Sequence, residues 1–153
     1  SVILIGGAMA YTFLKAKEVP TGGSRVEEDK VWLAKKLLDR ANALGVAIRL
    51  PTDHVVSDSL ENESGAEVRK DLPEGLMGLD IGPETVERYS LELQGASTIF
   101  WNGPMGVFER NAFSRGTAGI AQAVARSRAY SVVGGGDSAA GAGSTRCTRR
   151  VRR

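Results

Sequence analysis

Residues 98–109 read Thr98-Ile99-Phe100-Trp101-Asn102-Gly103-Pro104-Met105-Gly106-Val107-Phe108-Glu109, an apolar run that passes into a loop of turn-forming residues. The apolar run predicts a strand over Ser97 to Trp101, so the loop follows at its carboxyl end. Gly103 and Gly106 permit close approach of the backbone or a positive φ, and Pro104 fixes its own φ. Loops at the ends of strands often carry binding or catalytic residues. The stretch therefore predicts a functional loop held by a strand.

Strands and helices alternate on both sides of this loop. Residues 27–44 repeat apolar residues at helical spacing, and Gly45 supplies a C-terminal stop. Pro83, at the first position of a helix, and Glu84 mark another helix start. The expected strands are Val2 to Ile5, which is interpreted as buried, Val46 to Leu50, Ser97 to Trp101 and Tyr130 to Val133; the expected helices are Ala8 to Lys17, Glu27 to Leu44, Pro83 to Leu93 and Phe113 to Ser127.

Residues 52–82 carry a weaker pattern. Short strands are expected at Val55-Val56 and Glu67-Val68, joined by a polar turn over residues 61–65. Residues 75–82 are punctuated by glycine, and the next expected helix follows them at Pro83. The alternation as a whole predicts an α/β fold with three layers, a mostly parallel, Rossmann-like sheet with helices on both faces, incomplete at both ends of the chain.

Composition limits the classes of function. The chain of 153 residues with 42% hydrophobic residues is long enough for one compact domain. Its net charge of +2 comes from residues 141–153, which hold five arginines and no acid, and the rest has 15 basic against 18 acidic residues. We therefore expect no nucleic-acid footprint on the body. No apolar run is long enough to span a membrane, and the single cysteine, Cys147, fits a reducing, cytoplasmic location.

Glycine-rich segments follow three of the expected strands, at Gly6-Gly7, residues 101–109 and residues 134–138. The carboxyl ends of parallel strands meet at one edge, so these segments are expected to converge on one crevice. Glycines before a helix leave backbone N–H groups free to bind phosphate, although residues 134–138 are equally consistent with a plain tight turn. Asp137 either binds Mg²⁺ between itself and a phosphate or caps the following helix. Ser138 could serve in either role.

Other motifs are less specific. No lysine follows the glycines as a Walker A loop requires, and Gly134-x-Gly136-x-x-Ala139 meets the dinucleotide fingerprint without the later acidic residue. Glu109 is either a partner for ribose hydroxyls or a solvated surface charge. His54, the single histidine, is interpreted as part of a surface turn or a satisfied polar contact rather than as a general base.

Together the segments resemble the C-terminal, nucleotide-binding half of phosphoglycerate kinase. The resemblance covers residues 1 to about 140, and residues 141–153 diverge from it. The segments that carry it are LIGGAMAYTFLKA at Leu4 to Ala16, LPTDHVV at Leu50 to Val56, GLMGLDIGPET at Gly75 to Thr85, WNGPMGVFE at Trp101 to Glu109, F-x-x-GT at Phe113 to Thr117 and VVGGGDSAA at Val132 to Ala140.

The resemblance implies reversible phosphoryl transfer in glycolysis between 1,3-bisphosphoglycerate and ADP, giving 3-phosphoglycerate and ATP. It implies that Glu109 holds the ribose and that Asp137 binds the Mg²⁺ of MgADP or MgATP. Gly135 and Gly136 would lie along the phosphates and assist catalysis. The residues implied to bind the nucleotide are Gly6, Gly7, Gly78, Leu79, Asn102, Pro104, Gly106, Val107, Glu109, Gly135, Gly136, Asp137 and Ser138.

The departures from the family are equally informative. The N-terminal domain that binds phosphoglycerate and a GGAK-type segment are absent before residue 1, so we expect the chain to be inactive alone. A full-length protein is expected to be a monomer. We expect residues 1–140 to form a nucleotide-binding domain and residues 141–153 to be a divergent, disordered tail that arises from out-of-frame translation or a sequencing error. Two alternatives remain open: a non-enzymatic nucleotide-binding module, and a nucleic-acid binder that uses the basic tail.

Overall fold

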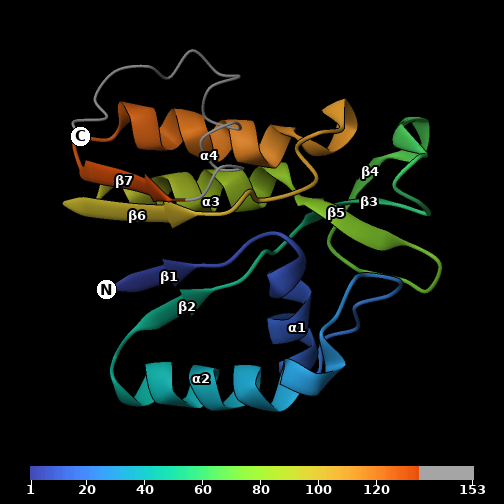
Figure 1. The fold of residues 1–153 in the computed structure, drawn as a ribbon, viewed down its shortest axis with the longest axis horizontal. Coiled ribbons are helices and arrows are strands. Elements are labelled where there is room, and N and C mark those ends of the chain that lie inside the picture. Colours follow the sequence, from blue (N-terminus) through green and yellow to red (C-terminus); the bar gives the residue numbers. More distant parts are fainter. Residues whose placement is uncertain (135–153) are drawn as a thin grey trace.

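A computed structural model describes residues 1–134 (Figure 1). Strands and helices alternate over most of this range, as the sequence predicts. The elements are β1 (Val2–Leu4), α1 (Ala8–Ala16), η1 (Glu28–Lys30), α2 (Val31–Ala43), β2 (Ala47–Arg49), β3 (His54–Ser57), η2 (Glu63–Gly65), β4 (Glu67–Arg69), β5 (Met77–Ile81), α3 (Pro83–Gln94), β6 (Thr98–Asn102), η3 (Asn111–Phe113), α4 (Arg115–Arg126) and β7 (Tyr130–Gly134).

Two pairs of parallel strands form the centre of the fold. β1 pairs with β2 and β6 pairs with β7, and each pair forms a two-stranded sheet. Figure 1 draws the four strands in the order β7, β6, β1 and β2, with all arrowheads pointing the same way. Among the described residues, no backbone ladder joins β1 to β6. The expected parallel arrangement is therefore confirmed, with an interruption between its two halves.

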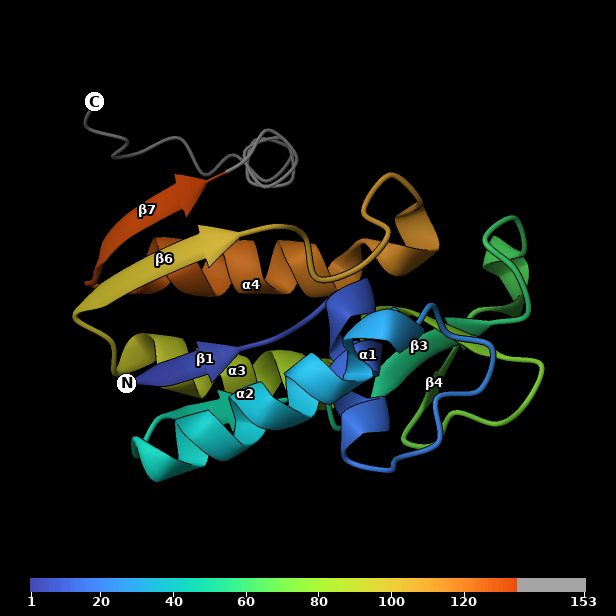
Figure 2. The same ribbon diagram turned by 60° about the horizontal axis from the view of Figure 1, so that its bottom comes forward.

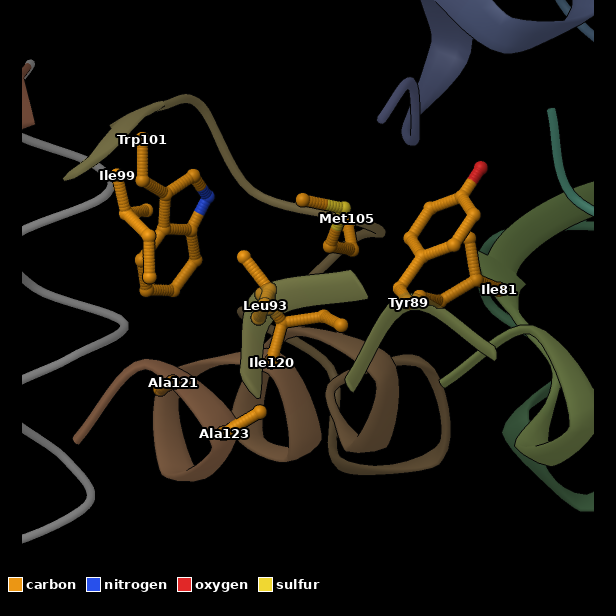
Figure 3. Close-up of a cluster of buried hydrophobic side chains, with 9 residues drawn as sticks. All are labelled: Ile81, Tyr89, Leu93, Ile99, Trp101, Met105, Ile120, Ala121 and Ala123. Atoms are coloured by element: carbon orange, nitrogen blue, oxygen red, sulfur yellow. The ribbon is translucent and has the colours of Figure 1, made fainter. Parts of the chain in front are cut away.

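Helices cover both faces of these strands (Figure 2). Alternation along β1 and the residue after it shows this directly, because successive side chains of an extended segment point to opposite faces. Leu4 packs against the cluster formed by α3, α4 and β6, whereas Ile5 packs with residues of α1 and α2. Figure 3 shows the first cluster, in which Ile99 and Trp101 of β6 lie beside Leu93 and Ile120. The predicted three layers are confirmed.

Residues 54–81 depart from the parallel pattern. β3 lies between β4 and β5 and pairs antiparallel with both, and no α-helix separates these strands. The expected short strands at Val55-Val56 and Glu67-Val68 are confirmed. Residues 75–82, for which the sequence pattern predicted no strand, contain β5. β5 pairs with β3, a segment distant in the sequence, and the glycine content of residues 75–82 does not indicate this pairing.

The predicted burial of β1 and of α2 is partly wrong. Val2 and Ile3 are 37% and 49% exposed, because β1 has a strand partner on one side only. In α2, the apolar residues at helical spacing include Ala34 and Ala41, which are buried, and Leu37, which is 41% exposed and lines a surface groove. The helix also starts later than expected, since residues 28–30 form the 3-10 turn η1. Some apolar residues of α2 therefore lie outside its contact with the rest of the domain.

Candidate functional site

The first glycine turn contacts the loop that follows β6. Gly7 has φ of 65° and donates a backbone hydrogen bond to the Met105 carbonyl oxygen at 2.9 Å. A Cβ atom on Gly7 would lie 3.0 Å from the Pro104 carbonyl oxygen, and one on Gly6 would lie 2.4 Å from the Met105 sulfur. Glycine at both positions allows this close approach. Two of the three segments that were predicted to converge therefore do so.

Hydrogen bonds with buried residues of β6 and α4 hold the loop after β6. The Trp101 indole N–H donates to the Gly103 carbonyl oxygen at 2.7 Å, so the side chain of the strand's buried tryptophan fixes the turn. The Met105 N–H donates to Oγ1 of Thr117, a buried residue of α4, at 3.0 Å. Gly103 has φ of 88°, which favours glycine there. The loop is therefore anchored by Trp101 of β6 and by Thr117 of α4.

β5 brings Gly78 and Leu79 to the same region. The Leu79 carbonyl oxygen accepts a hydrogen bond from the Val107 N–H at 2.9 Å, which joins β5 to the loop. A Cβ atom on Gly78 would lie 1.9 Å from the Tyr11 hydroxyl oxygen, so glycine lets α1 lie against β5. The strand that the sequence pattern missed thus carries two of the residues implied to bind the nucleotide.

The third glycine-rich segment is described only at its start. Gly134, the last residue of β7, is the register partner of Asn102 at the end of β6. The paired strands β6 and β7 therefore end at the same level. Gly135, Gly136, Asp137 and Ser138 lie outside the described residues.

Two polar residues of the loop face solvent. Asn102 and Glu109 are both exposed, and Glu109 forms no ion pair with any residue of the described range. Glu109 lies within a turn that the Arg110 N–H closes by donating to the Val107 carbonyl oxygen at 3.0 Å. Its carboxylate is therefore available to a ligand, although its exposure is also that of an ordinary surface charge.

A groove of about 510 Å³ runs between α2 and the interrupted strands, and one end of it reaches the site. Its walls are mainly apolar side chains of β1, α2 and β6, while Gly6, Asn102 and Pro104 line the end. Gly78, Leu79, Gly106, Val107 and Glu109 do not line it. The candidate residues thus fall into two neighbouring groups, linked through Met105 and Val107.

Asp80 is a buried carboxylate beneath the loop that the sequence pattern did not single out. It is 1% exposed, and its oxygens accept hydrogen bonds from the Gly116 N–H at 2.7 Å and the Ile81 N–H at 2.9 Å. Burial raises its pKa to about 7, an effect that the two N–H donors oppose. The available signal was an acidic residue between two apolar ones, Leu79 and Ile81, which is typical of a strand with a buried carboxylate.

This pKa predicts how stability depends on pH. Between pH 4 and pH 7 the folded chain keeps a proton on Asp80 that the unfolded chain releases, so the free energy of unfolding falls as pH rises. Relative to Asp80→Asn, the parent should lose at most about 4 kcal/mol across this range. Urea unfolding of both proteins at several pH values measures the difference. The prediction would be contradicted if the unfolding free energy of the parent, minus that of Asp80→Asn, stayed constant or rose with pH.

His54 is buried in β3 rather than in a surface turn. It is 3% exposed, and its Nδ1 lies 3.4 Å from the Tyr11 hydroxyl oxygen. Burial lowers its pKa, which favours the neutral form of the ring, and the nearby Asp53 opposes this effect. The expected surface turn is wrong, and the alternative interpretation, a satisfied polar contact, is confirmed.

The described residues contain no further constellation of reactive groups. Within residues 1–134, no group of three or more His, Cys, Asp or Glu side chains could hold a metal ion. Over the same range, no helix is both long and apolar enough to cross a membrane. The arrangement defines an α/β domain with glycine-rich turns at the carboxyl ends of its parallel strands, the class that binds ligands at that edge.

Comparison with known proteins identifies the family. The family model described as phosphoglycerate kinase matches residues 1–152, which reaches into the segment that we expected to diverge. The chain is 55% identical over 140 residues to phosphoglycerate kinase from Anaeromyxobacter dehalogenans and 50% identical over 141 residues to that from Bdellovibrio bacteriovorus, covering 90% and 91% of this chain. The chain belongs to the phosphoglycerate kinase family.

Solved structures agree with this assignment. The structure of phosphoglycerate kinase from Coxiella burnetii matches with a TM-score of 0.92 and 40% identity, covering 96% of this chain and 38% of that one. The enzyme from Pyrococcus horikoshii OT3 matches with a TM-score of 0.80 and 34% identity, covering 94% and 37%. The chain spans 35% of the length of both curated relatives named above.

Proposed function

We propose that this chain carries the nucleotide-binding part of a phosphoglycerate kinase and binds MgADP or MgATP. The whole protein would transfer a phosphoryl group between 1,3-bisphosphoglycerate and ADP in the cytoplasm. Residues outside this chain would bind the phosphoglycerate. Because phosphoryl transfer depends mainly on positioning and charge neutralisation, a preformed nucleotide loop is the contribution that this part can make.

One observation carries the proposal. Gly6-Gly7, Gly78-Leu79 and residues 102–109 are far apart in the sequence, yet backbone hydrogen bonds join them at Met105 and Val107. Glycine-rich segments offer backbone groups and flat apolar surface to a planar base. Gly78 and Leu79 would flank the adenine, opposite Gly6 and Gly7, and Asn102, Pro104, Gly106 and Val107 would line the rest of the nucleotide site.

The residues proposed to bind the ribose and the phosphates of the nucleotide have different roles. Glu109, exposed at the end of the loop, would accept hydrogen bonds from the ribose hydroxyls. Asp137 would bind the Mg²⁺ of the nucleotide, while Gly135, Gly136 and Ser138 would lie along its phosphates. The register pair Asn102 and Gly134 supports this arrangement, since it brings the ends of β6 and β7 side by side.

The ribose role of Glu109 predicts a specific loss of discrimination. The parent chain should bind ADP at least about 10-fold more tightly than 2′,3′-dideoxy-ADP, because hydrogen bonds to a charged group contribute about 1.5–3 kcal/mol. Glu109→Ala should weaken ADP binding and bring the ratio of the two dissociation constants close to 1. Isothermal titration of both nucleotides into both proteins gives the four constants.

Glu87→Ala serves as the matched control. Glu87 is an exposed glutamate of α3, away from the loop, and its removal should leave the ratio unchanged. A parent that binds both nucleotides equally, or a ratio that persists in Glu109→Ala, would contradict the assigned role of Glu109. A parent that binds neither nucleotide would contradict the proposed function itself.

A further inference from the structure

The carboxylate of Asp80 lies where three parts of the domain meet. Asp80 belongs to β5, next to Leu79, whose carbonyl oxygen holds the loop through Val107. A Cβ atom on Gly106 would lie 2.3 Å from its Oδ1 and 2.7 Å from its Cα. One on Gly116 would lie 2.2 Å from the same Oδ1. The carboxylate therefore fills the space between the loop and α4, and glycine is required on both sides of it.

Asp80 also supplies the N-terminal cap of α4. The residue in the N-cap position, Ser114, makes no side-chain cap hydrogen bond. The first turn of a helix has backbone N–H groups without intrahelical partners, and Asp80 Oδ2 accepts one of them, from Gly116. A carboxylate near this end also interacts favourably with the helix dipole. The start of α4 is thus capped by Asp80 of β5, 36 residues before Gly116 in the sequence, rather than by the side chain of its own N-cap residue.

α4 in turn holds the loop. Thr117, next to Gly116, accepts the Met105 N–H, and Met105 accepts the Gly7 N–H through its carbonyl oxygen. A displacement of the first turn of α4 would therefore move Met105 and the first glycine turn with it. Hydrogen bonds and close contacts link Asp80 to both sides of the candidate nucleotide site.

We propose that Asp80 is a positioning residue for nucleotide binding, because it sets the loop at Met105 to Val107 against β5 and α4. The proposal rests on the proposed function. Asp80 does not itself touch the ligand, since it is covered by Gly106 and Gly116. Its action passes through the loop, so its removal should lower nucleotide affinity whatever it does to the stability of the domain.

Asp53, the residue just before β3, offers a matched control. It is 3% exposed and accepts hydrogen bonds from the Glu84 and Thr85 N–H groups at 2.9 and 2.7 Å. It therefore caps α3, whose N-cap residue Gly82 has no side chain. Asp53 and Asp80 are both buried carboxylates that cap a helix from a distance, but only Asp80 touches the loop.

The test compares Asp80→Asn with Asp53→Asn, both of which keep the shape of the side chain. Asp80→Asn should raise the ADP dissociation constant by about 10-fold or more, and Asp53→Asn by less than about 2-fold, even where Asp53→Asn loses more unfolding free energy. Equal effects on affinity, or effects that follow the loss of stability, would overturn the proposal. Titration of folded protein and urea unfolding provide the two quantities.

Hydrogen exchange gives a readout that needs no nucleotide. In Asp80→Asn the Val107 and Gly116 amides should lose protection together, while the Glu84 and Thr85 amides keep theirs; Asp53→Asn should show the reverse. Unchanged protection at Val107 in Asp80→Asn would overturn the proposal. If the parent fails to bind ADP, the proposed function fails, and the exchange result alone decides whether Asp80 holds the loop. If Asp80→Asn does not fold, exchange in the parent decides: Val107 and Gly116 should open with one common free energy.

Discussion

Phe113→Ala should lower the free energy of unfolding by about 3–5 kcal/mol. Phe113 has no exposed surface and packs with Val55 and Leu79 in a cluster that also includes the partly buried Val107. Truncation leaves a cavity where η3, the antiparallel sheet and the loop meet, and close packing there allows little collapse. Urea unfolding followed by tryptophan fluorescence measures the change.

Phe100→Ala is the control for this prediction. Phe100 lies in β6 and is 72% exposed, so the same truncation should cost less than about 1 kcal/mol. Equal losses for the two variants would mean that the cluster around Phe113 does not stabilise the domain as its burial indicates.

Among substitutions of glycine by alanine in this chain, we expect Gly106→Ala to cause the largest loss of nucleotide affinity. The new Cβ atom would lie 2.3 Å from Asp80 Oδ1 and 2.7 Å from the Asp80 Cα, so a backbone atom as well as a side chain would have to move. We expect a loss of about 1–3 kcal/mol in unfolding free energy and of at least about 100-fold in ADP affinity, because the loop is displaced from β5.

The matching control is Gly95→Ala at the end of α3. There the nearest atom to a new Cβ would be the Glu92 carbonyl oxygen at 3.8 Å, and φ is −84°, which any residue adopts. Calorimetric titration should find parent-like ADP binding in Gly95→Ala. Parent-like binding in Gly106→Ala would contradict the view that the loop must lie against Asp80.

Local sequence patterns predicted the helices and the parallel strands well. α3 starts at Pro83 as expected, because proline and an adjacent glutamate favour that position, and Gly45 follows α2 with a φ of 64°. These signals depend on neighbouring residues. β5 was missed because its evidence is the pairing of Asp80 with Val55, a contact between segments that the sequence does not show to be adjacent.

The loops of the candidate site could be predicted from the sequence, whereas the buried residues that hold these loops in place could not. The motif at residues 101–109 and the glycine turn at Gly6-Gly7 indicated a shared edge, and the structure brings them together. Nothing in the sequence indicated that Asp80 lies between the loop and α4, since one acidic residue among apolar neighbours has no defined partner until the fold forms. The roles of Glu109 and Asp137 toward a ligand remain predictions.

Titration of the chain with ADP in the presence and absence of Mg²⁺ tests the central claim most directly. We expect ADP to bind, to bind more tightly with Mg²⁺, and to lose this difference in Asp137→Asn, because one carboxylate beside the phosphates would hold the metal. Saturating MgADP should also raise the unfolding midpoint of the parent. The absence of both binding heat and stabilisation by MgADP in the folded parent would contradict the claim that this chain holds the nucleotide, and equal affinity with and without Mg²⁺ would contradict the role of Asp137.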